Sequence, residues 1–276
     1  MKLEPSAHRD TFPRDSLPPF DQWPEIDLKA TPEIAAYPKR MNIAVELLDK
    51  NIAAHGDRPV LWYGDGHWTY KDLQNKVNQI AHVLVDDFGI VPGNRVMIRG
   101  FNHPMFVACW FAIMKVGGVC VATMPLYRNR ELTYMADFAK IGLALCDKRL
   151  SEEMELTSDK STGLKTICYY LGEGPDSLEA RMAKMPTTFI AVDTSADDVC
   201  LIAFTSGTTG PAKGCMHFHR DLMAINDTFA RYVLKPTKED IFTGSPPIAF
   251  TFGLGAVVTF PMSVGASTVM VEQYNP

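Results

Sequence analysis

The sequence lacks an excess of basic residues. Its 27 Lys and Arg residues stand against 32 Asp and Glu residues, which gives a net charge of −5 at pH 7. A protein that binds a nucleic-acid backbone or an anionic membrane needs positive charge to neutralise the phosphates. The composition therefore argues against nucleic acids and membranes as partners.

Paired cysteines and groups of metal ligands are also missing. None of the 6 cysteines belongs to a CxxC pair, and four lie inside apolar runs such as VCVAT and VCLIAF. We expect buried thiols in a reducing compartment and assign the protein to the cytoplasm. The histidine pair His217 and His219 has no third ligand beside it, which favours a structural role over a metal site.

Long uninterrupted apolar segments are absent as well. The N-terminus contains early charges and no apolar core, so it does not resemble a signal peptide. Residues 241–271 carry no charge and have the length of a membrane span, but Pro246, Pro247 and Pro261 divide the stretch into short pieces. This stretch and the apolar run at 105–114 are predicted to be buried in a large core.

The length and the proline distribution indicate a division of the chain. The 276 residues have an ordinary globular composition, with 46% apolar and 21% charged residues. Seven of the 19 prolines fall in residues 1–40, so we predict an extended N-terminal arm there that wraps around the body. Residues 41–276 form the predicted body.

Strand-like and helix-like segments alternate through the body. A helix is predicted from Asn42, and Thr69 and Asp72 form a capping box before an amphipathic helix. The predicted strands are 59–63, 95–99, 119–123, 143–146, 165–170 and 199–205, with further helices at 103–116 and 131–139. This rhythm predicts an α/β fold with parallel-rich sheets and helices on both faces. Residues 151–164 and 172–188 are polar and are predicted to be irregular surface segments.

A loop rich in glycine and hydroxyl groups follows the predicted strand at 199–205. Its glycines let backbone N–H groups approach a ligand closely, its hydroxyls are donors, and a lysine supplies a mobile positive charge. Such a set of donors suits a polyphosphate. The candidate phosphate-binding residues are Thr205, Ser206, Gly207, Thr208, Thr209, Gly210 and Lys213.

Two common nucleotide-binding patterns do not fit. The Walker A loop needs glycine immediately before its lysine and a helix after it, whereas Ala212 precedes Lys213, and Gly214 with a β-like run follows. The GxGxxG pattern fails at Val258. A merely flexible loop is the structural alternative, but the preceding buried strand and the lysine favour a phosphate site.

The segment TSGTTGPAKG at 205–214 resembles the phosphate loop [ST]SG[ST]TGxPKG of the AMP-forming acyl-CoA synthetases and other adenylating enzymes. Ala212 replaces the usual proline, which has shifted to Pro211, so the loop is expected to differ in stiffness while still binding phosphate. SPPIAFTFGLG at 245–255 is similar to the family segment in which an aromatic residue or a histidine lines the acyl pocket. Phe250 falls at that position, although core packing would also suit it.

The resemblance implies the N-terminal part of the large domain of an adenylating enzyme. ATP, Mg²⁺ and coenzyme A would take part, with Thr208 or Thr209 as a metal contact and Phe250 as an acyl-pocket wall. Residues 6–25, 37–49 and 215–222 look most like 2-aminobenzoate-CoA and benzoate-CoA ligases. A small aromatic carboxylic acid is therefore the expected substrate, and the resemblance also allows a homodimer of the full-length enzyme.

The resemblance also sets an expectation about completeness. The family's adenylation lysine, its acidic Mg²⁺ ligand and its C-terminal lid domain have no counterpart before Pro276. We therefore expect residues 41–276 to be an incomplete AMP-binding domain that contains no catalytic residue and is inactive alone. The alternatives are a non-catalytic module that binds a nucleotide or a carboxylic acid, and a ligase for medium-chain fatty acids.

Overall fold

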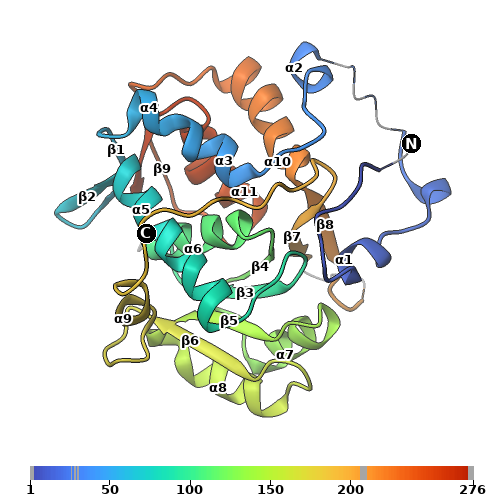
Figure 1. Ribbon diagram of the computed structural model, residues 1–276, viewed down its shortest axis with the longest axis vertical. Helices are drawn as coiled ribbons and strands as arrows, with labels where there is room; N and C mark the ends of the chain where they lie inside the picture. The colour runs from blue at the N-terminus through green and yellow to red at the C-terminus, as the bar shows by residue number, and fades with distance from the viewer. Residues whose placement is uncertain (1–2, 26, 28, 30, 206–209, 273–276) are drawn as a thin grey trace.

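The computed structural model describes residues 3–25, 27, 29, 31–205 and 210–272, and these residues build two β-sheets with helices between and outside them (Figure 1). The larger sheet has six strands in the order β6-β5-β3-β4-β7-β8, and the smaller has four in the order β2-β1-β10-β9. Non-consecutive neighbours within both sheets require crossover connections, as expected of an α/β fold.

The six-stranded sheet is parallel except at one edge. Its parallel strands are β3 (Arg95–Arg99), β4 (Val119–Thr123), β5 (Leu143–Asp147), β6 (Thr166–Tyr170) and β7 (Val199–Phe204). The edge strand β8 (Gly214–Phe218) runs antiparallel to β7. The predicted α/β class with parallel-rich sheets and helices on both faces is confirmed.

The four-stranded sheet combines an early hairpin with late strands. Its members are β1 (Pro59–Tyr63), β2 (Gly66–Thr69), β9 (Ile241–Gly244) and β10 (Ser267–Met270). The pairing of β2 with β1 is antiparallel, whereas β1, β10 and β9 are parallel to one another. The chargeless stretch at 241–271 thus supplies two strands of a sheet, and no helix within the described residues has the length and apolar character that a membrane span needs.

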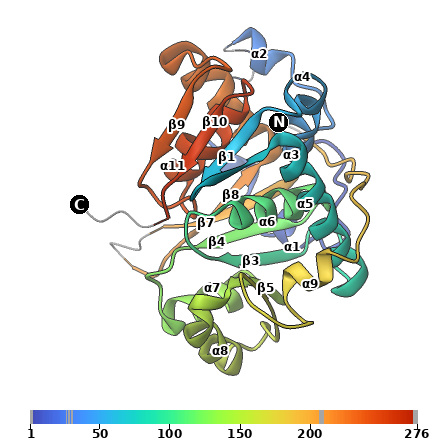
Figure 2. The ribbon, with the colours of Figure 1, turned by 90° about the vertical axis from the view of Figure 1, so that its left-hand side faces the viewer.

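A helical layer lies between the two sheets, as Figure 2 shows for α3 (Ile43–Leu47), α5 (Tyr70–His82) and α6 (Pro104–Lys115). Every residue of α6 is buried, because a helix that is apolar all round packs on several sides. Val96 and Ile98 of β3 face the core that contains α6, while Met97 faces the other core, under α7 (Asn129–Phe138) and α8 (Ser151–Lys160). Side chains that alternate between the two faces of β3 thus contribute to both hydrophobic cores.

Two predictions about polar segments were wrong. Residues 151–164 contain the helix α8, and residues 172–188 contain the short helix α9 (Leu178–Met182). Only Met154 and Thr157 of α8 are buried, so its apolar stripe is too sparse to stand out in the sequence. The helix predicted from Asn42 is also interrupted: α3 ends at Leu47, and a 3-10 turn separates it from the next helix.

The remaining elements of the body are short. They are α4 (Ile52–His55), η2 (Asp49–Asn51), η3 (Val83–Asp87), η4 (Lys148–Leu150), α10 (His219–Ile225), η5 (Asn226–Leu234), α11 (Thr251–Leu254), η6 (Gly255–Thr259) and α12 (Phe260–Met262).

Five of the six cysteines are buried, as the sequence predicts, whereas Cys215 on the edge strand β8 is exposed. All six are free thiols.

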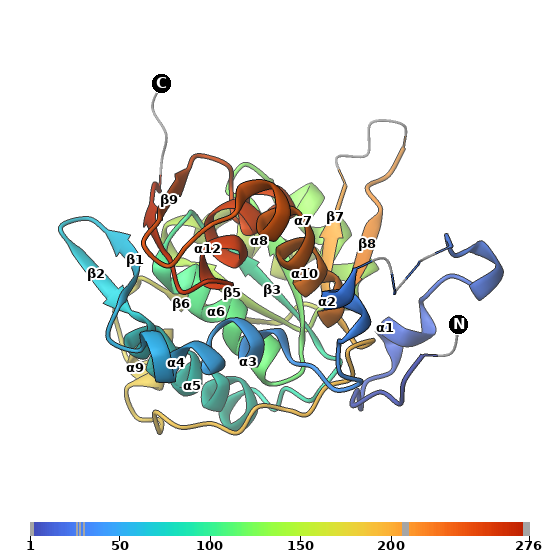
Figure 3. The same ribbon diagram turned by 90° about the horizontal axis from the view of Figure 1, so that it is seen from above.

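The N-terminal segment lies beside β8 (Figure 3) and contains the short helices α1 (Phe12–Asp15), η1 (Phe20–Gln22) and α2 (Pro32–Ala35). The Trp23 ring stacks on Phe218 of β8 with centroids 5.8 Å apart. Nearer its start, the Ala7 N–H donates to the buried Asp198 carboxylate at 2.9 Å. Aromatic packing and a buried carboxylate therefore attach this segment to the body.

Candidate functional site

The candidate phosphate loop joins β7 to β8, and its two ends are tied together. The Thr205 N–H donates to the Lys213 carbonyl oxygen at 3.0 Å, and the Lys213 N–H donates to Thr205 Oγ1 at 3.1 Å. These bonds continue the antiparallel pairing of β7 with β8. They use the backbone of Lys213 only, and its side chain is exposed next to the loop. The predicted binders Ser206, Gly207, Thr208 and Thr209 lie outside the described residues.

A cavity of about 850 Å³ opens beside this loop. It brings together the described ends of the loop and the predicted acyl-pocket residue Phe250, although these are far apart in the sequence. The cavity is lined by Met124, Tyr127, Arg130, Glu131, Tyr134, Met135, Thr205, Gly210, Pro211, Ala212 and Phe250.

Sheet topology explains why these segments meet. Strands β4 and β7 are parallel neighbours, so the segments that follow them leave the sheet at the same edge. Met124 and Tyr127 follow β4, and Thr205 follows β7. Ligand sites of parallel α/β sheets lie at this carboxyl edge. The cavity therefore occupies the position in which such a fold binds small molecules.

Aromatic side chains shape the cavity. The Tyr127 and Phe250 rings meet edge to face, with centroids 6.5 Å apart and planes at 87°. Burial raises the pKa of Tyr127 above its ordinary value, so its phenol is neutral at physiological pH. The Tyr134 hydroxyl donates to the Ala212 carbonyl oxygen at 2.9 Å and so fixes the loop at the position where the resembling family has proline.

The sequence did not single out the residues that complete this cavity. Tyr127, Tyr134 and Met124 all belong to the segment 124–135, for which the sequence predicts only a helix from residue 131 onward. The pattern of that segment indicates a helix start but does not reveal which side chains face a ligand. Which side chains face the cavity depends on how α7 packs against the loop, and that packing is a tertiary contact.

A charged cluster outside the cavity joins the two sheets. The Arg149 guanidinium hydrogen-bonds both the buried Asp147 of β5 and Glu272, which follows β10. The Tyr63 hydroxyl of β1 donates to Glu272 at 3.0 Å. The bond from Arg149, the largest influence, lowers the pKa of the Glu272 carboxyl. The cluster thus ties the carboxyl ends of strands from both sheets together.

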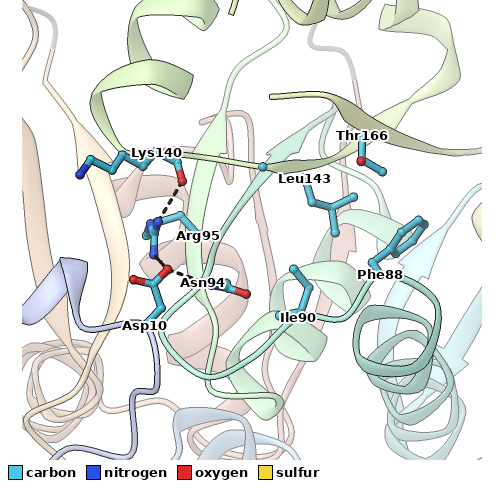
Figure 4. Close-up of a pocket in the computed structure, with 9 residues that line it drawn as sticks. Asp10, Phe88, Ile90, Asn94, Arg95, Lys140, Leu143 and Thr166 are labelled. Atoms are coloured by element: carbon cyan, nitrogen blue, oxygen red, sulfur yellow. Dashed lines mark hydrogen bonds and ion pairs between the residues drawn. The ribbon is translucent and has the colours of Figure 1, made fainter. Parts of the chain in front are cut away.

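A second cavity, of about 370 Å³, lies at the opposite, amino end of the six-stranded sheet (Figure 4). One wall is polar and contains Asp10, whose carboxylate accepts hydrogen bonds from the side chains of Asn94 and Arg95, while Phe88 and Leu143 form an apolar wall. None of the phosphate-loop residues that the structure describes lines it. This cavity is therefore separate from the candidate site.

His219 is buried where α10 packs against α3. Its Nδ1 accepts a hydrogen bond from the Ile43 N–H at 3.2 Å, and burial lowers the pKa of its imidazole to about 3. The ring is therefore neutral and part of the packing between α10 and α3. In the described part of the chain, no group of three or more His, Cys, Asp or Glu side chains is arranged to hold a metal ion.

Comparison with curated proteins reveals related CoA ligases. The chain is 29% identical over 248 residues to the benzoate-CoA ligase of Thauera aromatica, a match that covers 90% of this chain and 47% of that protein. It is 25% identical over 244 residues to a crotonobetaine/carnitine-CoA ligase of Salmonella paratyphi B, with 83% and 46% covered. The chain thus spans about half the length of these relatives.

Solved structures have the same fold. The anthranilate CoA ligase AuaEII, in complex with anthranoyl-AMP, superimposes with a TM-score of 0.83 and 25% identity, over 87% of this chain and 46% of that one. A benzoate CoA ligase from Burkholderia xenovorans gives a TM-score of 0.76 at 19% identity, over 84% and 46% of the two chains. The family of AMP-binding enzymes matches residues 48–276, so the chain belongs to that family.

Proposed function

We propose that this chain carries the phosphate-loop part of an AMP-forming aromatic acid-CoA ligase that activates 2-aminobenzoate or a benzoate-like acid. The observation that carries the proposal is one cavity with the described ends of the loop, Thr205 and residues 210–212, on one side and the Tyr127–Phe250 pair on another. The relatives that act on benzoate and anthranilate support it. We assign residues 41–276 to the AMP-binding domain, residues 1–40 to an arm, and the protein to the cytoplasm.

The loop would bind the phosphates of ATP. We assign this role to residues 205–210 and Lys213, because backbone N–H groups, hydroxyls and an ammonium all favour negatively charged oxygens. A carboxylate of the substrate would attack the α-phosphorus, forming an acyl-phosphate bond as the bond to pyrophosphate breaks. Donors held in place before the reaction would stabilise the charge that grows on the leaving pyrophosphate.

Mg²⁺ fits the oxygen-rich side of this cavity. Thr205 and Glu131, whose side chains carry oxygen atoms, are both lining residues, and Mg²⁺ prefers oxygen ligands, usually in company with substrate phosphates. The sequence-based candidates for the metal contact, Thr208 and Thr209, lie outside the described residues. When bound, the ion would neutralise phosphate charge as pyrophosphate leaves.

The acid would occupy the aromatic side of the cavity. Flat rings such as those of Phe250 and Tyr127 contact an aryl group through stacked or edge-to-face geometries, which are more favourable than their buried area alone implies. The carboxylate would then point toward the loop. In the second half-reaction, the thiolate of coenzyme A would attack the acyl carbonyl carbon and AMP would leave.

ATP-pyrophosphate exchange tests the proposed activity. The gene product that contains this sequence should incorporate labelled pyrophosphate into ATP when benzoate or 2-aminobenzoate is present, and not when acid is omitted. Nucleotide binding without acid-dependent exchange would favour the non-catalytic binding module. Exchange with octanoate but with no aryl acid would favour a ligase for medium-chain fatty acids.

Replacing Phe250 with alanine should change the choice of acid. The substitution removes one ring of the Tyr127–Phe250 pair and widens the cavity, so we expect kcat/KM for benzoate to fall by about tenfold or more relative to that for a straight-chain acid. Steady-state kinetics with matched aryl and alkyl acids measure this ratio. Phe252→Ala, at a neighbouring ring that is 74% exposed, is the control and should leave the ratio unchanged. If Phe250→Ala left the ratio of kcat/KM values unaltered, Phe250 would have only a packing role.

A further inference from the structure

Arg99, the last residue of β3, is a buried cation with an unusual set of partners. Only 1% of the surface of Arg99 is exposed to solvent. Its two terminal nitrogens donate to the carbonyl oxygens of Met124 at 2.9 Å, Pro125 at 3.0 Å and Tyr127 at 2.8 Å. All three acceptors belong to the segment 124–127. Two of these residues, Met124 and Tyr127, line the cavity beside the phosphate loop.

Besides Arg99, the segment 124–127 is held by the packing of Tyr127 against the core and by few polar contacts. Its internal backbone hydrogen bond joins the Tyr127 N–H to the Met124 carbonyl oxygen at 3.2 Å. Leu126 is 79% exposed, so core packing does not anchor the middle of the segment. A guanidinium presents several donors in a rigid plane and can fix several carbonyl oxygens at once, which a flexible ammonium cannot do in the same geometry. Arg99 is therefore the main polar anchor of this segment.

The other end of the same strand carries a second buried arginine with a different set of partners. Arg95 is also buried and donates to the carbonyl oxygens of Ala139 and Lys140, but it is paired with the Asp10 carboxylate (Figure 4). In the described part of the chain, no carboxylate hydrogen-bonds to Arg99. Burial lowers the pKa of the Arg99 guanidinium, as expected for a desolvated cation. An unpaired buried charge is costly, so its hydrogen bonds to segment 124–127 have to compensate for that cost.

The backbone of Arg99 is itself held in place. The buried Tyr170 hydroxyl of β6 donates to the Arg99 carbonyl oxygen at 3.0 Å. At the next residue, Gly100, a Cβ would overlap that hydroxyl, so the contact depends on the missing side chain. Tyr170, Arg99 and segment 124–127 therefore form a continuous chain of contacts that ends at the Tyr127–Phe250 pair.

We propose that Arg99 is a positioning residue that holds Met124 and Tyr127 at a fixed distance from Phe250 and so determines which aryl acid fits the cavity. The inference rests on the proposed function for its substrate class. It goes beyond that function by assigning selectivity to a residue outside the cavity lining. Displacement of a substrate-positioning group by about 1 Å can cost about 100-fold in rate, so a small shift of this segment is sufficient to alter selectivity.

Hydrogen exchange on the 276-residue chain tests the positioning role without any substrate. In Arg99→Lys, which keeps the charge but loses the planar fork, we expect amide exchange across residues 124–128 to accelerate by about tenfold, because local opening becomes easier. Arg95→Lys, the matched control on the same strand, should leave this segment unchanged. Tyr170→Phe, which loses one hydroxyl, should give a smaller change in the same direction, and it remains informative where Arg99→Lys does not fold. Unchanged exchange in the variants that fold would overturn the proposal.

Kinetics of the gene product that contains this sequence test the effect on selectivity. Arg99→Lys should raise the KM for benzoate and the KM for 2-aminobenzoate to extents that differ by about tenfold, while the KM for ATP stays the same, since only the acid side of the cavity moves. Equal changes in the KM values for the two acids, or none, would overturn the selectivity role. Absence of acid-dependent exchange in the unmodified protein would instead reject the proposed function. The hydrogen-exchange result would still decide whether Arg99 holds segment 124–127.

Discussion

Replacing Lys213 with alanine is expected to slow adenylation by about 100-fold or more. An ammonium that meets the phosphates as charge develops contributes as much as one preorganised donor of an oxyanion site, whose removal costs about 100-fold to 1000-fold. The fold should be unaffected, because both bonds between Lys213 and Thr205 use the lysine backbone, which alanine retains. ATP-pyrophosphate exchange measures the rate, and thermal unfolding checks the fold.

Lys71→Ala supplies the control for this prediction. Lys71 is an exposed lysine on α5 whose ammonium contacts Gln74, so its loss removes the same charge from a helix that supplies no residue to the cavity, whereas Lys213 directly follows the lining residue Ala212. We expect adenylation by this variant to match that of the unmodified protein. If Lys213→Ala retained normal adenylation kinetics, the phosphate-binding role of Lys213 would be rejected.

Among these variants, Asp198→Ala should lose the most stability. Its free energy of unfolding should fall by about 3 kcal/mol, because the substitution removes the acceptor of several buried hydrogen-bond donors. The Asp198 carboxylate is fully buried and accepts hydrogen bonds from the Ala7 and Ser195 N–H groups, each at 2.9 Å, and from the Ser6 hydroxyl. Two of these three donors belong to the N-terminal segment. We therefore expect that segment to become accessible to proteases as the free energy of unfolding falls.

Urea unfolding and limited proteolysis measure the two effects. Asp193→Ala is the matched control, since the Asp193 side chain is 79% exposed and pairs with Arg40 at 3.0 Å. Exposed ion pairs contribute about 0.2–1 kcal/mol, so this variant should stay close to the unmodified protein. Normal stability together with an uncleaved N-terminal segment in Asp198→Ala would show that the arm is held by other contacts.

Much of the secondary structure could be predicted because local signals were strong. The capping box of Thr69 and Asp72 is present, and α5 begins at Tyr70 as its sequence indicated. The apolar runs at 95–99 and 119–123 form β3 and β4 with the same bounds. Buried parallel strands read as continuous apolar runs, which makes them visible without knowledge of their neighbours.

The wrong predictions concern segments whose stability is not local. The helix α8 has only a sparse buried stripe at Met154 and Thr157, and its contacts with β5 and β6 supply what the sequence pattern does not. The helix predicted from Asn42 breaks after Leu47, where Asn51 instead donates to the Leu47 and Met262 carbonyl oxygens. Tertiary hydrogen bonds of this kind leave no periodic signal in a sequence.

The sequence by itself determined the α/β class, the glycine and hydroxyl loop with Lys213, and the candidate status of Phe250, because these depend on residue type and local spacing. Only the tertiary structure decided that the described ends of this loop share one cavity with Phe250, that Tyr127 and Tyr134 complete it, and that Arg99 donates hydrogen bonds to the segment that forms one of its walls. The reason is physical. A strand order such as β3-β4-β7 brings segments that are distant in the sequence to one edge of the sheet, and their packing decides which side chains point into the cavity.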